Sequence, residues 1–290
     1  GERYETGGYY DSYPVLFDIT NPLAVTKRDP VSPNYSNYAF AAAGNYMIVA
    51  AERSGVTFWN VADMAHPQPV GTYVNLPGSY AWSVAVSGNI ALVGTSASYL
   101  NVIDLSYDNS LSVIGSVQTT TPVGSTTEIR SIAIQDNLAF LANEAAGLKI
   151  VDIRSPGFPI VLNGYGVLPA GGSAAAVAAN ESLVLVADSV NGLLIYDATN
   201  VRSWTGGQSR IWPSSPSGGG AYDVKLRGNY AYVARGALGL DIWDISNPYS
   251  PIKVGTFIAD GFAPIQITLY KKQLYALDGN GKLFVLNLVP

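Results

Sequence analysis

Side chains that could carry acid–base or nucleophilic chemistry are few in this sequence. His66 is the only histidine, and it lies in the turn "DMAHPQP", so neither a Ser-His-Asp relay nor a multi-histidine metal site can be assembled around it. Cysteine is absent, which excludes disulfides, thiolate metal ligands and cysteine nucleophiles. No serine lies in a nucleophile-elbow context such as G-x-S-x-G before a helix. We therefore predict that the protein is not an enzyme and uses no cofactor.

One short stretch resembles part of a calcium-binding loop. "LDGNGKL", residues 277–283, places Asp278 and Asn280 at alternating positions, as calcium ligands are placed. The bidentate acid that completes such a loop is missing, and a glycine-rich turn between two strands would have the same residues. Asp278 and Asn280 are therefore the candidate metal ligands, although we expect no bound metal.

Charge and composition exclude several kinds of partner. The net charge is -5 and charged residues make up 13% of the chain, so the surface is poor in the cations that bind phosphates. No apolar run reaches the length of a membrane helix. We expect no nucleic-acid partner and no membrane span. Nineteen tyrosines, with many Ser, Thr, Asn and Gly, indicate a neutral, hydroxyl-rich exterior that suits contact with proteins or glycans.

A short sequence motif recurs along the whole chain. Each copy is a short apolar strand that ends in Asp or Asn, and we call this last residue the anchor of its repeat. The anchors are Asp18, Asn60, Asp104, Asp152, Asp197, Asp244 and Asn287. Their spacing of 42 to 48 residues indicates a repeat protein, which we expect to form one domain over residues 1–290.

A second phrase, midway between anchors, describes a β-hairpin. "AAAGNYMIVA", "VAVSGNIALVG" and "KLRGNYAYVA" each pair two short apolar strands around a two-residue turn, and three similar phrases bring the hairpins to six. A repeat then consists of hairpin strands a and b, strand c ending at the anchor, and a strand d such as "KVGTF". Four short strands in a period near 45, with no helical pattern, predict an all-β fold, a β-propeller of four-stranded blades.

Two structural roles follow from this assignment. The anchor side chain is predicted to accept backbone N–H groups of the turn that follows strand c. Alanines at alternate positions of strand a, such as Ala41 and Ala178, are predicted to fit the narrow centre of the ring.

The number of blades depends on how the ring closes. Six hairpins favour six blades, with seven as the alternative. The last repeat lacks strand d, whereas "LAVTKRD" at 23–29 is a strand d with no hairpin before it. We predict that this N-terminal strand closes the C-terminal blade. "YPVLFDI" at 13–19 is then a surplus strand c, which either builds a seventh blade with residues 1–12 or adds to the edge of a neighbouring molecule.

The strand c phrases also carry a family resemblance. "GLKIVDI", "YLNVIDL" and "GLDIWDIS" followed by "P..P...G" resemble the LVIVD repeat of propeller-forming proteins from bacterial and archaeal cell surfaces. The likeness extends from about Tyr13 to Leu288, but "P..P" is missing after Asp104 and Asp197. The resemblance implies a secreted or surface-displayed binding or structural module, and it supplies no catalytic residue.

Two sets of loop residues are candidates for binding. In this topology the loops between strands b and c share one rim, where they form a channel mouth of mixed charge or simply a ring of solvated turns. The candidates on this rim are Arg53, Glu144, Asp188 and Arg235. Trp204 and Trp212 lie in the long connection at 202–222, where they either hold the loop to its own propeller or contact a partner.

We therefore expect a non-enzymatic extracellular or cell-surface module for protein–protein interaction or self-assembly, whose partners are other surface proteins or copies of itself. The alternative is a small-molecule or glycan site at the channel mouth, with or without catalysis. Asn34 in "NYS" and Asn180 in "NES" are formal N-glycosylation acceptors.

Overall fold

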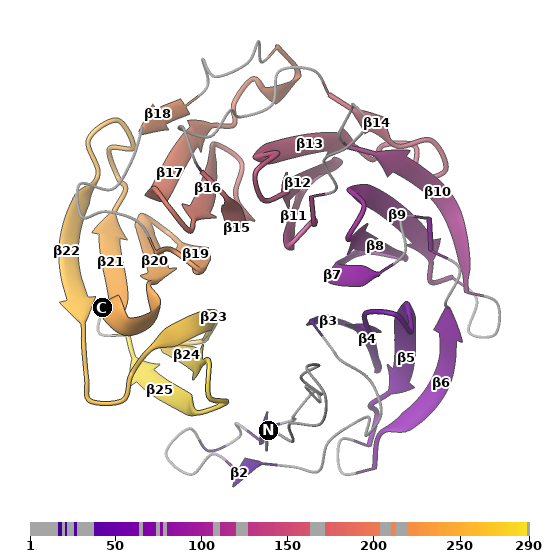
Figure 1. The fold of residues 1–290 in the computed structure, drawn as a ribbon, viewed down its shortest axis with the longest axis horizontal. Coiled ribbons are helices and arrows are strands. Elements are labelled where there is room, and N and C mark those ends of the chain that lie inside the picture. The colour runs from indigo at the N-terminus through magenta and orange to yellow at the C-terminus, as the bar shows by residue number, and fades with distance from the viewer. Residues whose placement is uncertain are drawn as a thin grey trace. The chain divides into compact units, whose positions relative to one another are not determined.

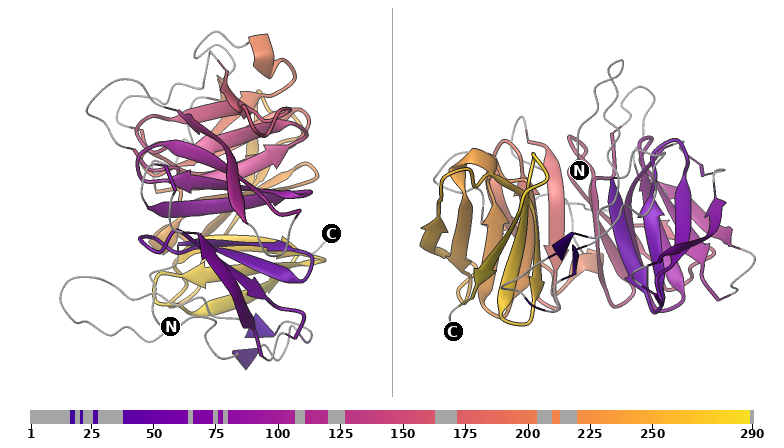
Figure 2. Two further views of the ribbon diagram at one scale, coloured as in Figure 1. Left: turned by 90° about the vertical axis from the view of Figure 1, so that its right-hand side faces the viewer. Right: turned by 90° about the horizontal axis from the view of Figure 1, so that it is seen from below.

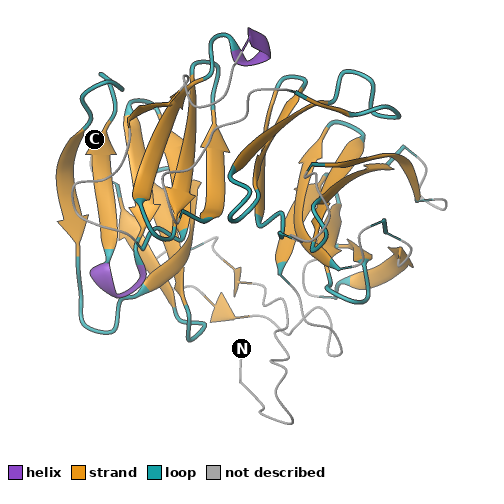
Figure 3. Cartoon of the chain, turned by 45° about the horizontal axis from the view of Figure 1, so that its top comes forward, coloured by secondary structure: helices purple, strands orange, loops and turns teal. Residues whose placement is uncertain are grey.

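The computed structural model describes residues 17–18, 21, 26–27, 38–63, 66–73, 76–77, 80–106, 111–119, 127–162, 172–203, 210–212 and 220–288. The chain is an all-β, six-bladed β-propeller with antiparallel blades, as favoured from the sequence (Figure 1). Within the described residues the helices are two short 3-10 turns, η1 (Val201–Ser203) and η2 (Gly236–Leu238) (Figure 3). Neither is long and apolar enough to cross a membrane.

The chain divides into two compact units, and the first consists of Gly1–Ile129 and Ser155–Pro159. Its first blade contains β3 (Ala39–Ala43), β4 (Tyr46–Ala50), β5 (Val56–Asn60) and β6 (Gln68–Tyr73). Its second blade contains β7 (Ala81–Ser87), β8 (Ile90–Thr95), β9 (Tyr99–Asp104) and β10 (Ser112–Gln118). Ile48 and Phe58 of the first blade share a core with Val84 and Val93 of the second.

The second unit, Arg130–Arg154 and Ile160–Pro290, contains the other four blades. The third blade contains β11 (Ser131–Gln135), β12 (Leu138–Ala142), β13 (Leu148–Asp152) and β14 (Ile160–Val161). The fourth contains β15 (Ala174–Ala179), β16 (Leu183–Asp188), β17 (Gly192–Asp197) and β18 (Arg210–Trp212). The fifth contains β19 (Asp223–Arg227), β20 (Tyr230–Ala234), β21 (Leu240–Asp244) and β22 (Ile252–Phe257).

The sixth blade has three strands in the described residues: β23 (Pro264–Tyr270), β24 (Gln273–Asp278) and β25 (Leu283–Asn287). Neighbouring blades of the second unit contact each other through their first strands, β11 with β15, β15 with β19, and β19 with β23. Figure 2 shows the fifth and sixth blades side by side in orange and yellow. The expectation of one domain over residues 1–290 stays a prediction.

Strand a packs on both of its faces. In β15, Val177 belongs to the core shared with the third blade, whereas Ala176 and Ala178 belong to the core shared with the fifth. Ala41 of β3 likewise packs in the core that contains Val84 of β7. These alanines therefore lie between blades, which corrects their predicted place at the centre of the ring. They are small because the first strands of neighbouring blades approach closely.

The anchors have the predicted structural role. In five blades, Oδ1 of the anchor accepts the backbone N–H of the residue two positions later, at 2.8 to 3.1 Å. These five anchors are Asn60, Asp104, Asp152, Asp197 and Asp244. Each bond fixes the turn that leads from strand c toward strand d, which explains why Asp and Asn recur there.

The N-terminal strands pair with each other. β1 (Phe17–Asp18) and β2 (Thr26–Lys27) form a two-stranded sheet in which Asp18 pairs with Thr26. The same offset of eight residues joins strand c to strand d in four blades, where Asn60 pairs with Gln68, Asp104 with Ser112, Asp152 with Ile160 and Asp244 with Ile252. β1 and β2 therefore have the c–d register of a blade. Closure of the sixth blade by residues 23–29 stays a prediction, and most of 13–19 and 23–29 lies outside the described residues.

Candidate functional site

Asp188, predicted for the rim, and Asp278, the candidate metal ligand, are buried within their own loops. Oδ1 of Asp188 accepts the backbone N–H groups of Val190 and Asn191 at 2.8 and 2.7 Å. Oδ1 of Asp278 accepts those of Asn280 and Lys282 at 2.9 and 2.8 Å. Both carboxylates therefore build the turn between strands b and c. In the part of the chain that the structure describes, no three His, Cys, Asp or Glu residues gather in a way that could hold a metal ion.

Arg235 is also buried, with a side-chain exposure of 5%, and it forms an ion pair with Asp241 of β21. Nη1 of Arg235 lies 2.9 Å from Oδ2 of Asp241, and the hydroxyl of Thr256 donates to Oδ1 at 2.6 Å. Lys253 of β22 adds a second cation at 3.5 Å. This network joins the b–c loop of the fifth blade to its outer strand, so Arg235 stabilises the blade from within.

Asp241 was not predicted as a partner of Arg235, because it lies on a strand and the candidate binding residues were loop residues. A signal was present: Asp241 lies three positions before its anchor, on strand c, where a polar residue interrupts an apolar phrase. Thr57, Asn101 and Lys149 occupy the same position in other blades, and all are buried. Burial lowers the pKa of Lys149 from 10.5 to about 8. A polar residue therefore recurs at this position in four blades, whereas Leu194 and Phe284 occupy it in the fourth and sixth.

Arg53 and Glu144 are more accessible and belong to different units. The guanidinium of Arg53 lies 5.2 Å from the centre of the Tyr80 ring. Glu144 forms an ion pair with Arg130 at 2.9 Å, and its backbone exchanges two hydrogen bonds with Ala174 of the next blade. Glu144, Asp188 and Arg235 lie on the third, fourth and fifth blades, each with its own local partners.

Of the two predicted loop tryptophans, Trp204 lies outside the described residues. Trp212 ends β18 and pairs with Ile195 of β17, which corrects its predicted place in a loop. The fourth blade reaches its outer strand after a longer connection than the other four-stranded blades, as the pairing of Tyr196 with Arg210 shows.

The anchor of the third blade has additional cationic partners. Asp152 is buried and accepts hydrogen bonds from Arg154, at 3.1 and 3.0 Å, and from Arg202 of η1. Burial alone raises its pKa, but the hydrogen bonds from Arg202 and Arg154 outweigh that effect and hold the pKa well below the ordinary value of 3.8. Asp152 therefore ties the c–d connection of the fourth blade to the third blade. By contrast, His66 is exposed and contacts Asp63 at 2.9 Å, as a solvated surface imidazole does.

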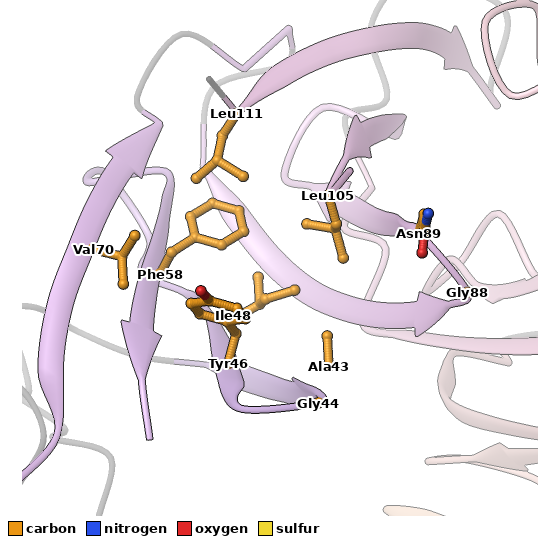
Figure 4. Close-up of a pocket in the computed structure, with 10 residues that line it drawn as sticks. All are labelled: Ala43, Gly44, Tyr46, Ile48, Phe58, Val70, Gly88, Asn89, Leu105 and Leu111. Atoms are coloured by element: carbon orange, nitrogen blue, oxygen red, sulfur yellow. The ribbon is translucent and has the colours of Figure 1, made fainter. Parts of the chain in front are cut away.

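Three grooves occupy equivalent places between blades, next to the a–b turns. The first, of about 260 Å³, lies between the first and second blades and has apolar walls that include Ile48, Phe58 and Leu105 (Figure 4). The second, about 330 Å³, lies between the third and fourth blades, and the third, about 280 Å³, between the fourth and fifth. These grooves open beside the a–b turns and the residues that follow the anchors, whereas the predicted site lies on the b–c loops.

A different surface of the second unit combines an unpaired strand with exposed aliphatic side chains. Among the described residues no strand pairs with the free edge of β25. In the neighbouring fifth blade, the outer strand β22 exposes Ile252 and Val254, whose exposed fractions are 64% and 54%. We call the free edge of β25 together with Ile252, Val254 and Gly255 of β22 the outer edge.

Pairing partners show which way β22 faces. Phe257 pairs with Leu240 and Gly255 with Ile242, and residues directly opposite in a sheet project to the same face. Leu240 and Ile242 pack in the core of the sixth blade, and the Phe257 ring meets the Phe262 ring edge-to-face at 5.0 Å. This face of β22 is therefore directed toward the sixth blade, which has three strands in the described residues.

The second blade shows what covers the corresponding face elsewhere. A Cβ added to Gly115 of β10 would lie 2.2 Å from the carbonyl oxygen of Pro156, because the turn Ser155–Pro159 lies against this strand. Gly255 occupies the same place in β22, in "KVGTF" against "VIGSV", yet a Cβ added there meets nothing within 4 Å. Among the described residues, no turn lies against Gly255, and none lies against Gly71 at the equivalent place in β6.

Comparison with solved structures shows the fold. A 6-phosphogluconolactonase-like protein from Bacteroides uniformis is 15% identical with a TM-score of 0.72, over 89% of this chain and 83% of that chain. The outer coat vertex of COPII on membranes is 11% identical with a TM-score of 0.72, over 99% and 79%. BamB from Moraxella catarrhalis is 15% identical with a TM-score of 0.63, over 89% and 72%. No curated protein matches the chain.

The family is shown by the repeats themselves. The profile of the LVIVD repeat matches residues 78–119, 128–165, 171–203 and 218–258. These ranges span the second to fifth blades, where the strand c phrases, their anchors and the Asx turns recur. Because the matches cover more than half of the chain, the protein belongs to the LVIVD repeat family.

Proposed function

We propose that this protein is a non-enzymatic extracellular or cell-surface module that binds other surface proteins or copies of itself through the outer edge. The observation that carries the proposal is the free edge of β25 beside the uncovered face of β22. A free edge presents unpaired N–H and C=O groups to an incoming strand, and the aliphatic side chains next to it add apolar contact area.

The N-terminal strand β2 has a strand partner within its own unit. It pairs with β1 in the register that strand d uses toward strand c in the blades. A strand supplied by another molecule would extend the sixth blade from three strands to four, the number found in each of the other five. It would also cover Ile252 and fill the space above Gly255.

The alternative function, ligand binding at the channel mouth, has less support. Two of its charged candidates, Asp188 and Arg235, are buried and hydrogen-bonded within their own blades. The remaining candidates, Arg53 and Glu144, are engaged by Tyr80 and Arg130. A charged group that already has a partner has less to offer a ligand, because it must first give up that partner.

Light scattering and negative-stain electron microscopy of the full chain test the proposal. We expect the wild-type protein to associate with itself or to capture a purified surface protein from the same cells. The double substitution Ile252→Lys and Val254→Lys should weaken that association at least tenfold, because it places two charges on the exposed aliphatic surface of β22. The melting temperature should change little, because both side chains are exposed.

Val190→Lys is the matched control, because Val190 is similarly exposed, at 49%, in the b–c loop of the fourth blade. It should associate as the wild type does. A wild-type protein that stays monomeric and captures no surface protein would contradict the proposal, and so would equal weakening by the control.

A further inference from the structure

The hairpin turn of the fourth blade departs from the repeat. Four of the other a–b turns have Asn as their second residue, at Asn45, Asn89, Asn137 and Asn229, and the sixth has Lys272 there. The first residue of each of these five turns has a positive φ, between +51° and +58°. In the fourth blade three residues, Asn180, Glu181 and Ser182, join β15 to β16, and none of them has a positive φ.

Hairpin formation alone does not require this change. The backbone carbonyl of Ser182 accepts the N–H of Ala198 at 2.7 Å, and the carbonyl of Asn229 in the fifth blade accepts the N–H of Ile245 at 2.8 Å in the same way. The backbone carbonyl at the position of Ser182 thus accepts the same hydrogen bond as in the fifth blade, while the side chains of this turn differ from those of the other blades. Residues that depart from an otherwise structural repeat pattern are the ones expected to have a function.

The new side chains form an N-glycosylation acceptor. Asn180-Glu181-Ser182 satisfies the pattern N-x-S with x other than Pro. The hydroxyl of Ser182 donates to Oδ1 of Asn180 at 3.3 Å, and the backbone N–H groups of Ser182 and Leu183 donate to the same oxygen at 3.0 and 2.8 Å. Oδ1 is therefore fully engaged, whereas Nδ2 of Asn180 has no hydrogen bond to any residue that the structure describes.

The surroundings of Asn180 leave room for a sugar. Asn180 is half-buried, and Glu181 and Ser182 are exposed. Asn180 lines both the second and the third groove, of about 330 and 280 Å³. The third groove also contains the amide of Asn229 and the Tyr249 ring, which is 64% exposed, so polar and aromatic contacts for a sugar lie beside the acceptor.

We propose that Asn180 carries an N-linked glycan. In the transfer reaction, Nδ2 forms a bond to C1 of the first sugar of a polyprenyl-phosphate-linked oligosaccharide. The bond between C1 and the phosphate oxygen breaks, the lipid phosphate leaves, and the amide loses one proton to a base of the transferase. The inference rests on the extracellular or cell-surface location of the proposed function, because N-glycans are found on secreted proteins.

Mass spectrometry of the protein purified from the organism that makes it tests this proposal. We expect an intact mass that falls when N-glycans are removed enzymatically, and a glycopeptide with the sugar on Asn180. Ser182→Ala should remove that mass increment, and Ser182→Thr should keep it, because Thr retains the hydroxyl. Both variants should melt close to the wild type, since the Ser182 hydroxyl bonds only the Asn180 side chain among described residues.

Cell fractionation separates failure of this proposal from failure of the proposed function. Protein found outside the cell with Asn180 unmodified overturns the glycan and leaves the proposed function standing. Protein found only in the cytoplasm with Asn180 unmodified overturns both. A mass increment that persists in Ser182→Ala places the modification elsewhere and also overturns the assignment to Asn180. Asn34, the other acceptor, lies outside the described residues, and its peptide is scored separately.

Discussion

At the scale of single residues, the buried Lys149 on β13 should make the free energy of unfolding depend on pH. Its pKa is lowered by burial from 10.5 to about 8, so between pH 8 and 10.5 the unfolded chain holds a proton that the folded chain has lost. The free energy of unfolding should therefore rise with pH across this window, whereas below pH 8 both states are protonated and the destabilisation is constant. Lys149→Met should be more stable at pH 7 and lack this rise. Urea unfolding of both proteins from pH 7 to 10.5 isolates Lys149 by difference, and parallel curves would contradict the prediction.

The ion pair of Arg235 and Asp241 gives a second prediction at this scale. Both side chains are buried, at 5% and 1% exposure, so removing one leaves the other charged and desolvated. Asp241→Ala should lower the free energy of unfolding by about 3–5 kcal/mol. Asp63→Ala, which removes an exposed contact to His66, should change it by less than about 1 kcal/mol. Denaturant titration measures both, and equal effects would show that burial does not set the strength of these pairs.

At the scale of elements, two equivalent glycines should respond differently to the same substitution. Gly115→Ala places a methyl group 2.2 Å from the carbonyl oxygen of Pro156, so it should destabilise the protein by about 1–3 kcal/mol. Gly255→Ala meets nothing within 4 Å and should leave the melting temperature nearly unchanged. If a partner strand covers β22 as proposed, Gly255→Ala should weaken association instead. Thermal melts and light scattering of both variants decide this, and a large loss of stability in Gly255→Ala would mean that the site is already filled.

Elements were predictable from the sequence where local chemistry repeats. The anchors, the Gly-Asn turns and the four-strand unit follow from residue types whose hydrogen bonds and φ values are local, as the bonds of Asp104 and Asp244 show. Features that depend on contacts between blades were not predictable. From the sequence, Arg235 is an ordinary loop cation, and only the structure shows that it pairs with Asp241 on β21. Likewise, β18 was not predicted within its Gly- and Ser-rich stretch, because it forms by pairing with β17, which is distant in the sequence.

At the scale of the whole molecule, the first and last strands that the structure describes belong to the same part of the repeat. β1 and β2 have the register of strands c and d, and β25 is a strand c that ends at the anchor Asn287. The described residues thus include seven strands of type c and six hairpins. One c strand is left over, and one d position, beside β25, is unfilled in the described residues. Because one strand of type c is extra and the strand d position beside β25 is unfilled, we expect either the N-terminal strand or a strand of a partner to pair with the free edge of β25.

Deleting residues 1–30 distinguishes these two occupants of the edge. If residues 23–29 close the sixth blade, the truncated chain loses strand d, so it should unfold cooperatively at a lower temperature. It should also associate more strongly, because the competing strand has been removed from an edge lined by Ile252 and Val254. If the strand comes from a partner, the melting temperature should stay close to that of the full chain and association should persist. Calorimetry and light scattering measure the two properties together. A truncated chain that melts like the full chain and stays monomeric would exclude the N-terminal strand as the closure and would remove the outer edge as an assembly surface.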